Sequence, residues 1–587
     1  MTAAGMSSGT ARLGPLEQLP PDLQIRLTGF LSMSEILALS ETSKRLFTIA
    51  RTDMVWRERL KDELGITTLT DRPPGEEVGV IVEAHQSFAL YRDWRRSFNL
   101  YPNALIKGMR MWWKGMEDYL EKNLPAAYRS LGPPLSEHQI EAVLTDDRSG
   151  YASELALPKT LRLLYRFHDG QILPGQRRLL HEKGPHQFSS FSSRAEVLEL
   201  GLGLFGGVSY YTDWTVCYVL PLRSVVVLNR PGTHYLDTHQ FACRTSSIFN
   251  AATSHSVAAG VPGAVAVVEP EKDRGGKRSS DFVLFAINAL NLSTQTPCKG
   301  FFVERSGGSG VFTNTRRSPP VDADLELTPC VSRAQRVVAG AGAGPAAGSI
   351  MLAWLLEYLR RLKEKVYVVA PLSQTATTAA EVELQSNQAA NPHYISLFDA
   401  SSKGLVTNGV ELKASPYLVS HESAAASSSG GGGGGGGAAL LFWTYRISMR
   451  LLRSSDSRPP RLGSCQLVSR HWRIASEQEG EQAVDGLGVV GEFPLLTLEA
   501  GEKSAWAYSS CSHHGESGVL FGGKIKFRCA PGSLSLASAS QAKAQPARGS
   551  ELHVSDSSGQ MQLGDEAFEA TLPTMALDVA CLNGFLY

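Results

Sequence analysis

Three glycines form the first pattern in this sequence that could carry chemistry. Gly486, Gly488 and Gly491, within "VDGLGVVGEFPLL", spell GxGxxG, the spacing of loops that bind a dinucleotide pyrophosphate. Such a loop requires a buried strand before it and a helix that begins at its third glycine, because the helix N-terminus binds the pyrophosphate. The preceding "EQEGEQAVD" is too polar for a buried parallel strand, and Pro494 follows closely. The sequence therefore predicts a turn between strands, and no cofactor.

Histidines form the second pattern that could carry chemistry. His168 is followed by Asp169, but adjacent residues on a turn rarely point at one substrate, and no serine or cysteine nucleophile accompanies them in a recognisable motif. We interpret "HDG" as a turn that ends a helix, with Gly170 in the left-handed conformation. His471 and the pair His513-His514 have no acidic or cysteine partners at metal-ligand spacing, so no metal site is predicted.

Length and composition narrow the class of protein. At 587 residues the chain is too long for one core, which favours about two to four domains. Lys+Arg and Asp+Glu both total 57, so we expect no general attraction to nucleic acid or to an anionic membrane. The 8 cysteines form no CxxC pair, and the first residues show no apolar signal segment. We interpret the cysteines as reduced thiols in a cytoplasmic and/or nuclear protein.

One uncharged stretch could be mistaken for a membrane span. Residues 337–356 carry no charge over about the length of a spanning helix. Their first part, "VVAGAGAGPAAG", offers little apolar area and contains a proline. We expect a loop followed by a soluble helix, and no membrane partner.

The elements that would position any functional residue begin with a helical block at residues 16–64. Ser32 and Glu35 have the spacing of a capping box, which marks the start of a helix. Apolar residues around them exceed what one short helix can bury, and a segment this small rarely makes its own core. It either packs on the next domain or offers its apolar face to a partner.

This block resembles an F-box, the module by which substrate receptors dock on the Skp adaptor of cullin-type ubiquitin ligases. The matching residues are Leu19-Pro20, Leu23, Ile25, Leu31, Ile36, Leu37, Leu39, Ser40, Ser43-Lys44, Leu46 and Trp56. The resemblance implies an all-α module. It also implies an adaptor-binding set of Leu19, Pro20, Leu23, Ile25, Leu31, Ile36, Leu39 and Trp56.

Residues 100–369 mix helical and strand patterns and predict an α+β domain with long insertions. In "MLAWLLEYLRRLKEK" four leucines recur at spacings of one helical turn, which predicts an amphipathic helix. The β-branched run "CYVLPLRSVVVLN" is interpreted as strand. The region resembles the SUKH superfamily, a non-catalytic protein-binding fold. That resemblance is carried by Trp113, Glu117, Leu157-Pro158, Leu161, Tyr165, His168-Asp169-Gly170 and the helix around Trp354.

The remainder, predicted as a linker at 370–394 and a β-rich domain at 395–587, alternates apolar and polar residues in several segments. It resembles the ApaG domain, a fibronectin-III-like all-β sandwich, with insertions at 421–439 and 531–562. That resemblance is carried by Gln466-Leu467, Ser469-Arg470-His471-Trp472, Val484, Gly486, Gly488-Val489-Val490-Gly491-Glu492, Pro494, Gly501, Tyr508-Ser509-Ser510 and Gly518. Trp472 and Glu492 are the candidate target-binding residues.

Together the three modules resemble the F-box only protein 3 family of animals, plants and algae. The resemblance implies a non-catalytic receptor that docks on a Skp adaptor and cullin scaffold and holds an unidentified target protein for ubiquitination. One alternative is a protein-binding scaffold without a ligase. Another is an enzyme that uses the glycine loop, whose nucleotide affinity would be lost in Gly488→Asp.

Overall fold

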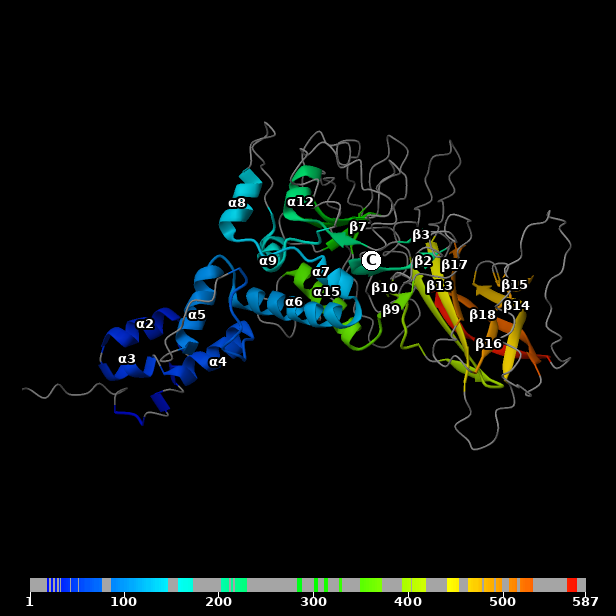
Figure 1. Cartoon of the computed structure of the whole chain (residues 1–587), viewed down its shortest axis with the longest axis horizontal. Coiled ribbons are helices and arrows are strands. Elements are labelled where there is room, and N and C mark those ends of the chain that lie inside the picture. The colour runs from blue at the N-terminus through cyan, green and yellow to red at the C-terminus, as the bar shows by residue number, and fades with distance from the viewer. Residues whose placement is uncertain are drawn as a thin grey trace, which may run out of the picture.

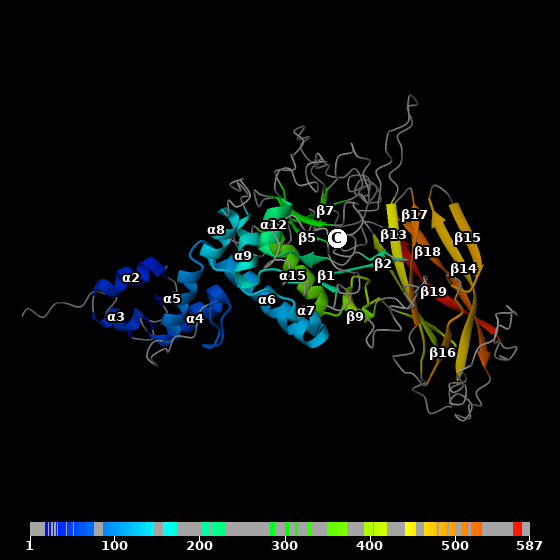
Figure 2. The same ribbon diagram turned by 45° about the horizontal axis from the view of Figure 1, so that its top comes forward.

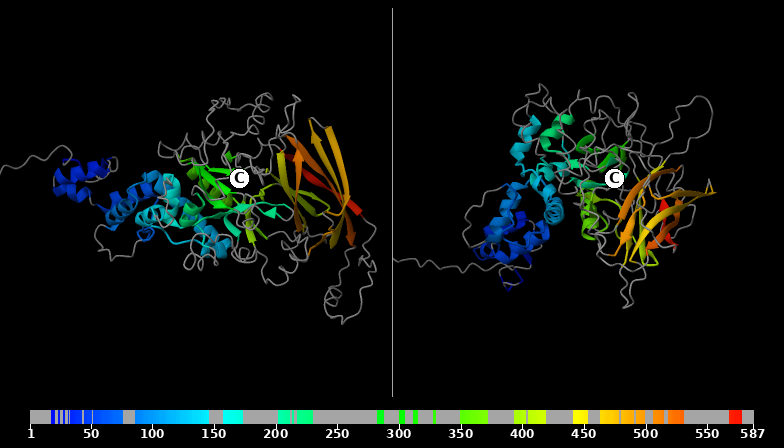
Figure 3. Two further views of the ribbon diagram at one scale, coloured as in Figure 1. Left: turned by 90° about the horizontal axis from the view of Figure 1, so that it is seen from above. Right: turned by 45° about the vertical axis from the view of Figure 1, so that its right-hand side comes forward.

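The computed structural model is elongated, with a helical region at one end, a mixed α/β region in the middle and a sandwich of two sheets at the other end (Figure 1). The same order is seen from above (Figure 3, left). The structure describes residues 18–20, 23–24, 27–28, 31, 33–42, 44–50, 52–75, 86–145, 157–172, 202–210, 213–214, 217–229, 282–287, 300–304, 311–314, 327–329, 349–371, 393–402, 404–418, 441–452, 463–477, 480–489, 492–498, 506–514, 518–530 and 567–577. Among these residues, no helix is long and apolar enough to cross a membrane.

The N-terminal region contains three short helices whose bounds the structure describes, α2 (Met33–Thr42), α3 (Lys44–Ala50) and α4 (Asp53–Leu64), and residues 23–24 and 27–28 are helical as well. Helix α4 ends where Gly65 adopts φ +70°, a left-handed conformation that glycine reaches without a Cβ penalty. Trp56 of α4 is 1% exposed, and its Nε1–H donates to the carbonyl of Ala50 at 2.5 Å. Its ring lies 4.8 Å from Phe88 and 5.0 Å from Tyr91, centroid to centroid. The N-terminal helices therefore complete their core against the next region.

The middle region contains seven described helices. They are α5 (Gln86–Ser97), α6 (Asn103–Asn123), α7 (Pro125–Arg129), α8 (Glu137–Thr145), α9 (Lys159–Phe167), α12 (Leu222–Leu228) and α15 (Ile350–Lys363). The predicted amphipathic helix is confirmed as α15, whose Leu352 and Leu359 are buried. These two leucines lie against Gly108 and Gly115 of α6, where an added Cβ would come within 2.6 and 2.5 Å of them. The glycines let the two helices approach closely.

The sheets of the middle region are small. One runs in the order β4 (Tyr218–Val219), β5 (Phe282–Ile287), β6 (Gly300–Glu304), β7 (Val311–Asn314) and β8 (Leu327–Pro329). A second has the order β1 (Leu202–Gly207), β10 (His393–Ser396) and β9 (Val368–Pro371), and a third pairs β2 (Ser209–Tyr210) with β3 (Asp213–Trp214). The mixture of helices and sheets agrees with the predicted α+β class.

Two details of the middle region differ from the sequence interpretation. The run Leu222–Leu228, interpreted as strand, is helix α12. The N–H of Leu222, at its first position, donates to the partly buried Asp169 carboxylate at 2.7 Å. That cap favours a helix despite the β-branched residues. Strand β10 pairs with β9 and β1, so 393–396 belong to the middle region, whereas the ApaG domain was predicted to start at 395. Of the predicted linker, residues 372–392 lie outside the described residues.

The "HDG" turn ends helix α9 as predicted, with Gly170 at φ +61°. His168 bonds through Nε2 to Glu117 at 2.7 Å and through Nδ1 to the carbonyl of Gly132 at 2.8 Å. Burial raises the pKa of Asp169 to about 6, and the hydrogen bond from Leu222 opposes that rise. Both side chains therefore join segments of the middle region, which is a structural role.

The C-terminal region packs two sheets face to face. One has the order β11 (Leu405–Thr407), β12 (Val410–Leu418), β13 (Leu441–Leu451) and β17 (Trp506–His514). The other has the order β15 (Gly480–Leu487), β14 (Ser464–Ser476), β18 (Val519–Ala530) and β19 (Ala567–Leu577), with β16 (Leu495–Thr497) also paired to β14. Both predicted insertions, 421–439 and 531–562, lie outside the described residues. Alternate residues of the strands fill a core between the sheets.

The sandwich meets the middle region through its four-stranded sheet. Figure 2 shows β13 and β17 on the side of the middle region and β14 and β15 on the far side. Tyr417 and Phe442 of the near sheet join the core of the middle region, where the ring of Phe398 lies 6.3 Å from that of Tyr417. The outer face of the five-stranded sheet is thereby left away from the rest of the molecule.

Candidate functional site

The glycine loop forms a turn, as the sequence predicts. Gly486 is part of β15, and Gly488 has φ +59°. Val489 and Glu492 then pair as a β-bridge, and β16 follows. Gly491 lies outside the described residues. A helix N-terminus aimed at a pyrophosphate is not found among residues 480–489 and 492–498, which are all strand, bridge or turn.

The glycines of this loop lie against an arginine. An added Cβ at Gly486 would come within 3.0 Å of the Arg470 guanidinium carbon, so a side chain there would displace it. The guanidinium donates to the carbonyl of Gly488 at 2.7 Å and, more weakly, to that of Leu487 at 3.4 Å. The loop therefore fixes a cation on the sandwich. An added Cβ at Gly488 would lie 2.5 Å from the Glu492 carbonyl, so Gly488→Asp would disturb the turn whether or not a nucleotide binds.

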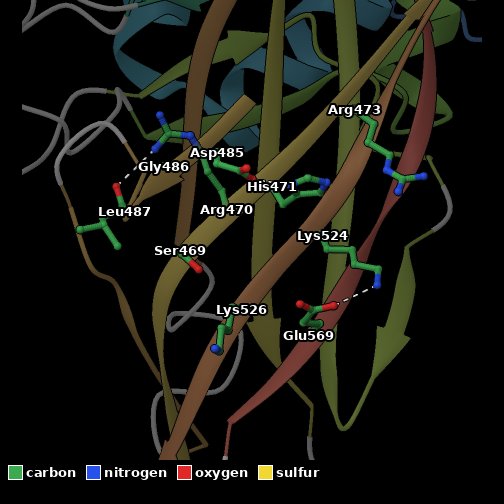
Figure 4. Close-up of a pocket in the computed structure, with 10 residues that line it drawn as sticks. All are labelled: Ser469, Arg470, His471, Arg473, Asp485, Gly486, Leu487, Lys524, Lys526 and Glu569. Carbon is green, nitrogen blue, oxygen red and sulfur yellow. Dashed lines mark hydrogen bonds and ion pairs between the residues drawn. The ribbon is translucent and has the colours of Figure 1, made fainter. Parts of the chain in front are cut away.

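A groove of about 660 Å³ lies over the five-stranded sheet, beside this loop (Figure 4). Strands β14, β15, β18 and β19 contribute to it. Its lining residues are Ser469, Arg470, His471, Arg473, Asp485, Gly486, Leu487, Lys524, Lys526 and Glu569. Two carboxylates thus face four permanently charged cations and one histidine, in a chain whose total charge is balanced.

Ion pairs organise the polar groups of the groove. The Lys524 ammonium lies 2.9 Å from a Glu569 carboxylate oxygen, and this hydrogen bond holds the pKa of Glu569 below its usual range. His471 Nδ1 bonds to the Asp485 carboxylate. The register places Asp485, His471 and Lys524 in one row across the sheet, and Glu569 lies opposite Lys526 in the neighbouring row. The arrangement can bind anions, and it contains no nucleophile with an adjacent base.

The two candidate target-binding residues lie in different environments. Trp472 is 4% exposed and stacks at an angle on Phe521, with 5.6 Å between ring centroids, so it belongs to the core. Glu492 is exposed in the turn after the glycine loop. A binding role for this pair remains a prediction. The groove lies beside them, and its lining includes residues that the sequence did not single out, among them Arg473, Lys524 and Lys526. The alternation Lys524-Ile525-Lys526 is the signal that could have indicated the outer face.

The described residues contain no cluster of three or more His, Cys, Asp or Glu side chains arranged to hold a metal ion. His513 and His514 lie on β17, the ring of His513 against Phe442 at 4.5 Å between centroids, while His471 lies on the other sheet. The four cysteines in the described part, Cys217, Cys465, Cys511 and Cys529, take part in no disulfide.

The N-terminal helices present a second candidate surface. Leu23 is 46% exposed and Leu27 41% exposed, and Pro20 is exposed beside them. Phe47 and Met54 add exposed apolar side chains that the predicted adaptor-binding set did not include.

The predicted adaptor-binding residues divide by burial. Leu19, Leu31 and Leu39 are half-buried, and Leu31 packs on the core. Ile36 and Trp56 are fully buried, so in this conformation they support the helices from within. Ile25 lies outside the described residues. Adaptor binding itself remains a prediction for the whole set.

Comparisons with known proteins give one family-model match near the C-terminal end and several relatives. The family model described as "ApaG domain" matches residues 438–528. F-box protein SKIP16 of Arabidopsis thaliana is 27% identical over 496 residues, which cover 84% of this chain and 88% of that protein. F-box only protein 3 of Homo sapiens is 41% identical over 71 residues, covering 12% of this chain and 13% of that protein. Protein ApaG of Nitrosospira multiformis is 64% identical over 33 residues, covering 6% of this chain and 26% of that protein. Neither the family model nor these relatives carry the name of an enzyme. The chain is thus similar to F-box proteins and, over residues 438–528, to the ApaG domain.

Proposed function

We propose that this protein is the substrate-recognition subunit of a Skp–cullin–F-box ubiquitin ligase. The N-terminal helices would bind the adaptor, and the region formed by the SUKH-like and ApaG domains would hold the target. The observation that carries the proposal is the exposed apolar surface at Leu23 and Leu27, which lie outside the core that the N-terminal helices share with the middle region. Its support from relatives is the F-box name shared by SKIP16 and F-box only protein 3.

The physical case for a partner at the N-terminal helices rests on where their apolar side chains lie. Trp56 and Ile36 are buried, whereas Leu23, Leu27 and Met54 are 46%, 41% and 50% exposed. Large exposed apolar side chains that gather on one small region are typical of a protein-binding surface. An adaptor groove that covered them would remove apolar area from water, which is the main favourable term in association.

The elongated shape suits a receptor that joins two partners. The N-terminal helices and the sandwich lie at opposite ends of the molecule (Figure 1). A target held at the far end would place its lysines near a ubiquitin-charged conjugating enzyme at high effective concentration. The bond chemistry belongs to that enzyme, and this chain contributes binding and position.

Co-purification with a Skp–cullin pair tests the adaptor role. The full chain is expected to be captured stoichiometrically, and Leu23→Lys/Leu27→Lys is expected to lose capture, because two charges would be buried in the interface. One hot-spot residue is worth about 2 kcal/mol, so loss of one such contact alone should lower the affinity ~30-fold. Leu19→Ala/Pro20→Ala should weaken capture as well.

Leu100→Lys/Met111→Lys is the matched control, since both residues are exposed apolar side chains of the middle region. Circular dichroism of each variant checks that it folds. No capture of the wild type would refute the adaptor role and leave a protein-binding scaffold. Equal loss in the control would show that the effect does not come from the N-terminal surface.

A further inference from the structure

The groove on the five-stranded sheet has an excess of cations that the ion pairs within it do not use. Lys524 pairs with Glu569, and His471 with Asp485. Arg473 lies 3.5 Å from Glu481, but both side chains are about two-thirds exposed, and pairs this exposed are weak and exchange readily. Lys526 makes no direct ion pair with a carboxylate in the described part of the chain, although its charge contributes to the lowered pKa of Glu569. The groove can therefore accept further negative charge.

The sheet holds these cations at fixed positions. Lys526 lies opposite Ser469 on β14 and opposite Glu569 on β19. It is the next residue after Lys524 on the same face of β18. Figure 4 shows the short side chain of Ser469 near the longer side chain of Lys526. Arg470 is held by the carbonyls of the glycine loop. Side chains carried on paired strands bind a charged partner with little loss of order.

One apolar residue marks an end of the groove. Leu487 is 73% exposed, at the last position of β15, and it has no described core partner. It lies directly opposite Ser469, so it borders the same row as Lys526. A ligand that fits both features carries negative charges and one apolar group, spaced along an extended chain.

We propose that this groove binds an extended acidic segment of the target protein, whose carboxylates contact Arg473, Lys524 and Lys526 and whose apolar residue packs on Leu487. This inference rests on the proposed function, because it names the chemistry of the target that the receptor holds. Charge complementarity selects acidic segments and speeds their association, and the strength of binding falls as salt screens the cations.

Fluorescence anisotropy of the full chain with a labelled peptide tests the groove. The probe is a glutamate–serine repeat that ends in leucine, and a lysine–serine repeat with the same end is its charge control. Arg473→Gln/Lys526→Gln is expected to weaken binding of the acidic probe about tenfold or more, because charged contacts are lost. Lys114→Gln/Lys122→Gln removes the same charge from exposed positions of helix α6 and should change little.

The outcomes separate local binding from general attraction. Weakening in the groove variant alone, with no binding of the lysine probe, supports the proposal. Equal weakening in both variants, no binding by the wild type, or displacement of the probe by inorganic phosphate would overturn it. Capture by the Skp–cullin pair is measured on Arg473→Gln/Lys526→Gln in parallel. Retained capture with lost peptide binding would keep the two proposals distinct, whereas failed capture by the wild type is a failure of the proposed function.

Discussion

The two ends of the molecule solve the problem of burying apolar surface in different ways. The N-terminal helices share one continuous core with the middle region, through contacts such as Trp56 with Phe88 and Tyr91. The sandwich closes a core of its own between two sheets and adds only a few side chains to the middle core. Their surfaces differ as well, since one end exposes leucines and the other a row of charges.

That difference follows from size and geometry. Three short helices enclose too little volume to bury a tryptophan from all sides, so they depend on α5 for the remaining contacts. Two facing sheets can interdigitate alternate side chains along their whole length. The N-terminal region therefore owes its stability to the junction with the middle region, whereas the sandwich depends mainly on itself.

The largest effects are expected from replacing one buried tryptophan in each region, Trp56 in the N-terminal helices and Trp472 in the sandwich. These replacements test whether the first core is shared and the second is separate. Trp56→Ala and Trp472→Ala should each reduce the free energy of unfolding by about 3–5 kcal/mol, because each leaves a cavity in a core. Hydrogen exchange should distinguish them. Trp56→Ala should lower protection in both α4 and α5, and Trp472→Ala only in the sandwich.

The exposed Met54, also on α4, provides the control, and Met54→Ala should change stability by less than about 0.5 kcal/mol. If Trp56→Ala left the protection of α5 unchanged, the shared core would be refuted.

Patterns that depend on local periodicity were predictable from the sequence. The leucines of α15 recur on one face of the helix, so the sequence alone indicates which face is buried. The glycine loop was also predictable as a turn, since a polar segment precedes it and a proline follows. In contrast, helix α12 depends on Asp169, more than fifty residues earlier in the chain, so β-branched residues alone pointed to a strand.

The groove could not be predicted for a related reason. Its row of charges exists because β14, β15, β18 and β19 pair in one particular register, which includes a shift between Leu467 and Ser469. A shift of one residue moves every following side chain to the other face, and sequence alone did not fix it. The N-terminal surface was predicted as a set, but burial divides that set into supporting and exposed residues.

Asp169 in the middle region and Glu569 on the sandwich should give the stability of the protein opposite dependences on pH. Burial raises the pKa of Asp169 in the middle region to about 6, from an ordinary value of 3.8. The folded protein then holds a proton that the unfolded chain has released, so stability should fall as pH rises from about 4 to about 6 and level off above. The difference of about two pKa units corresponds to roughly 3 kcal/mol. Asp169→Asn should lose this dependence, because an amide does not titrate in this pH range. The fold should be kept, because the amide oxygen can still accept the hydrogen bond from Leu222.

Urea denaturation of wild type and variant at several pH values measures the difference. Glu569→Gln on the sandwich is the contrasting variant. In the wild type the pKa of Glu569 is lowered, mainly by the hydrogen bond from Lys524. The contribution of Glu569 to stability is therefore present above its unfolded pKa and is lost as pH falls through its folded pKa. The two variants should therefore differ from wild type with opposite slopes. Parallel slopes would contradict the assignment of Asp169 as a buried, partly protonated group.

The smallest expected effect compares one ion pair from each end. On the sandwich, Glu411 and Arg450 lie directly opposite each other on β12 and β13, and the glutamate side chain is only 14% exposed. On α4, Asp53 and Arg57 lie one turn apart at 3.0 Å, and both are well exposed. Double-mutant cycles with alanine should give a coupling of about 0.5–1 kcal/mol for the first pair and about 0.3–0.5 kcal/mol for the second. Salt should reduce the helical coupling more, because water and ions reach it from more sides. A larger coupling on α4 than across the strands would mean that the N-terminal helices are held more rigidly than their borrowed core implies.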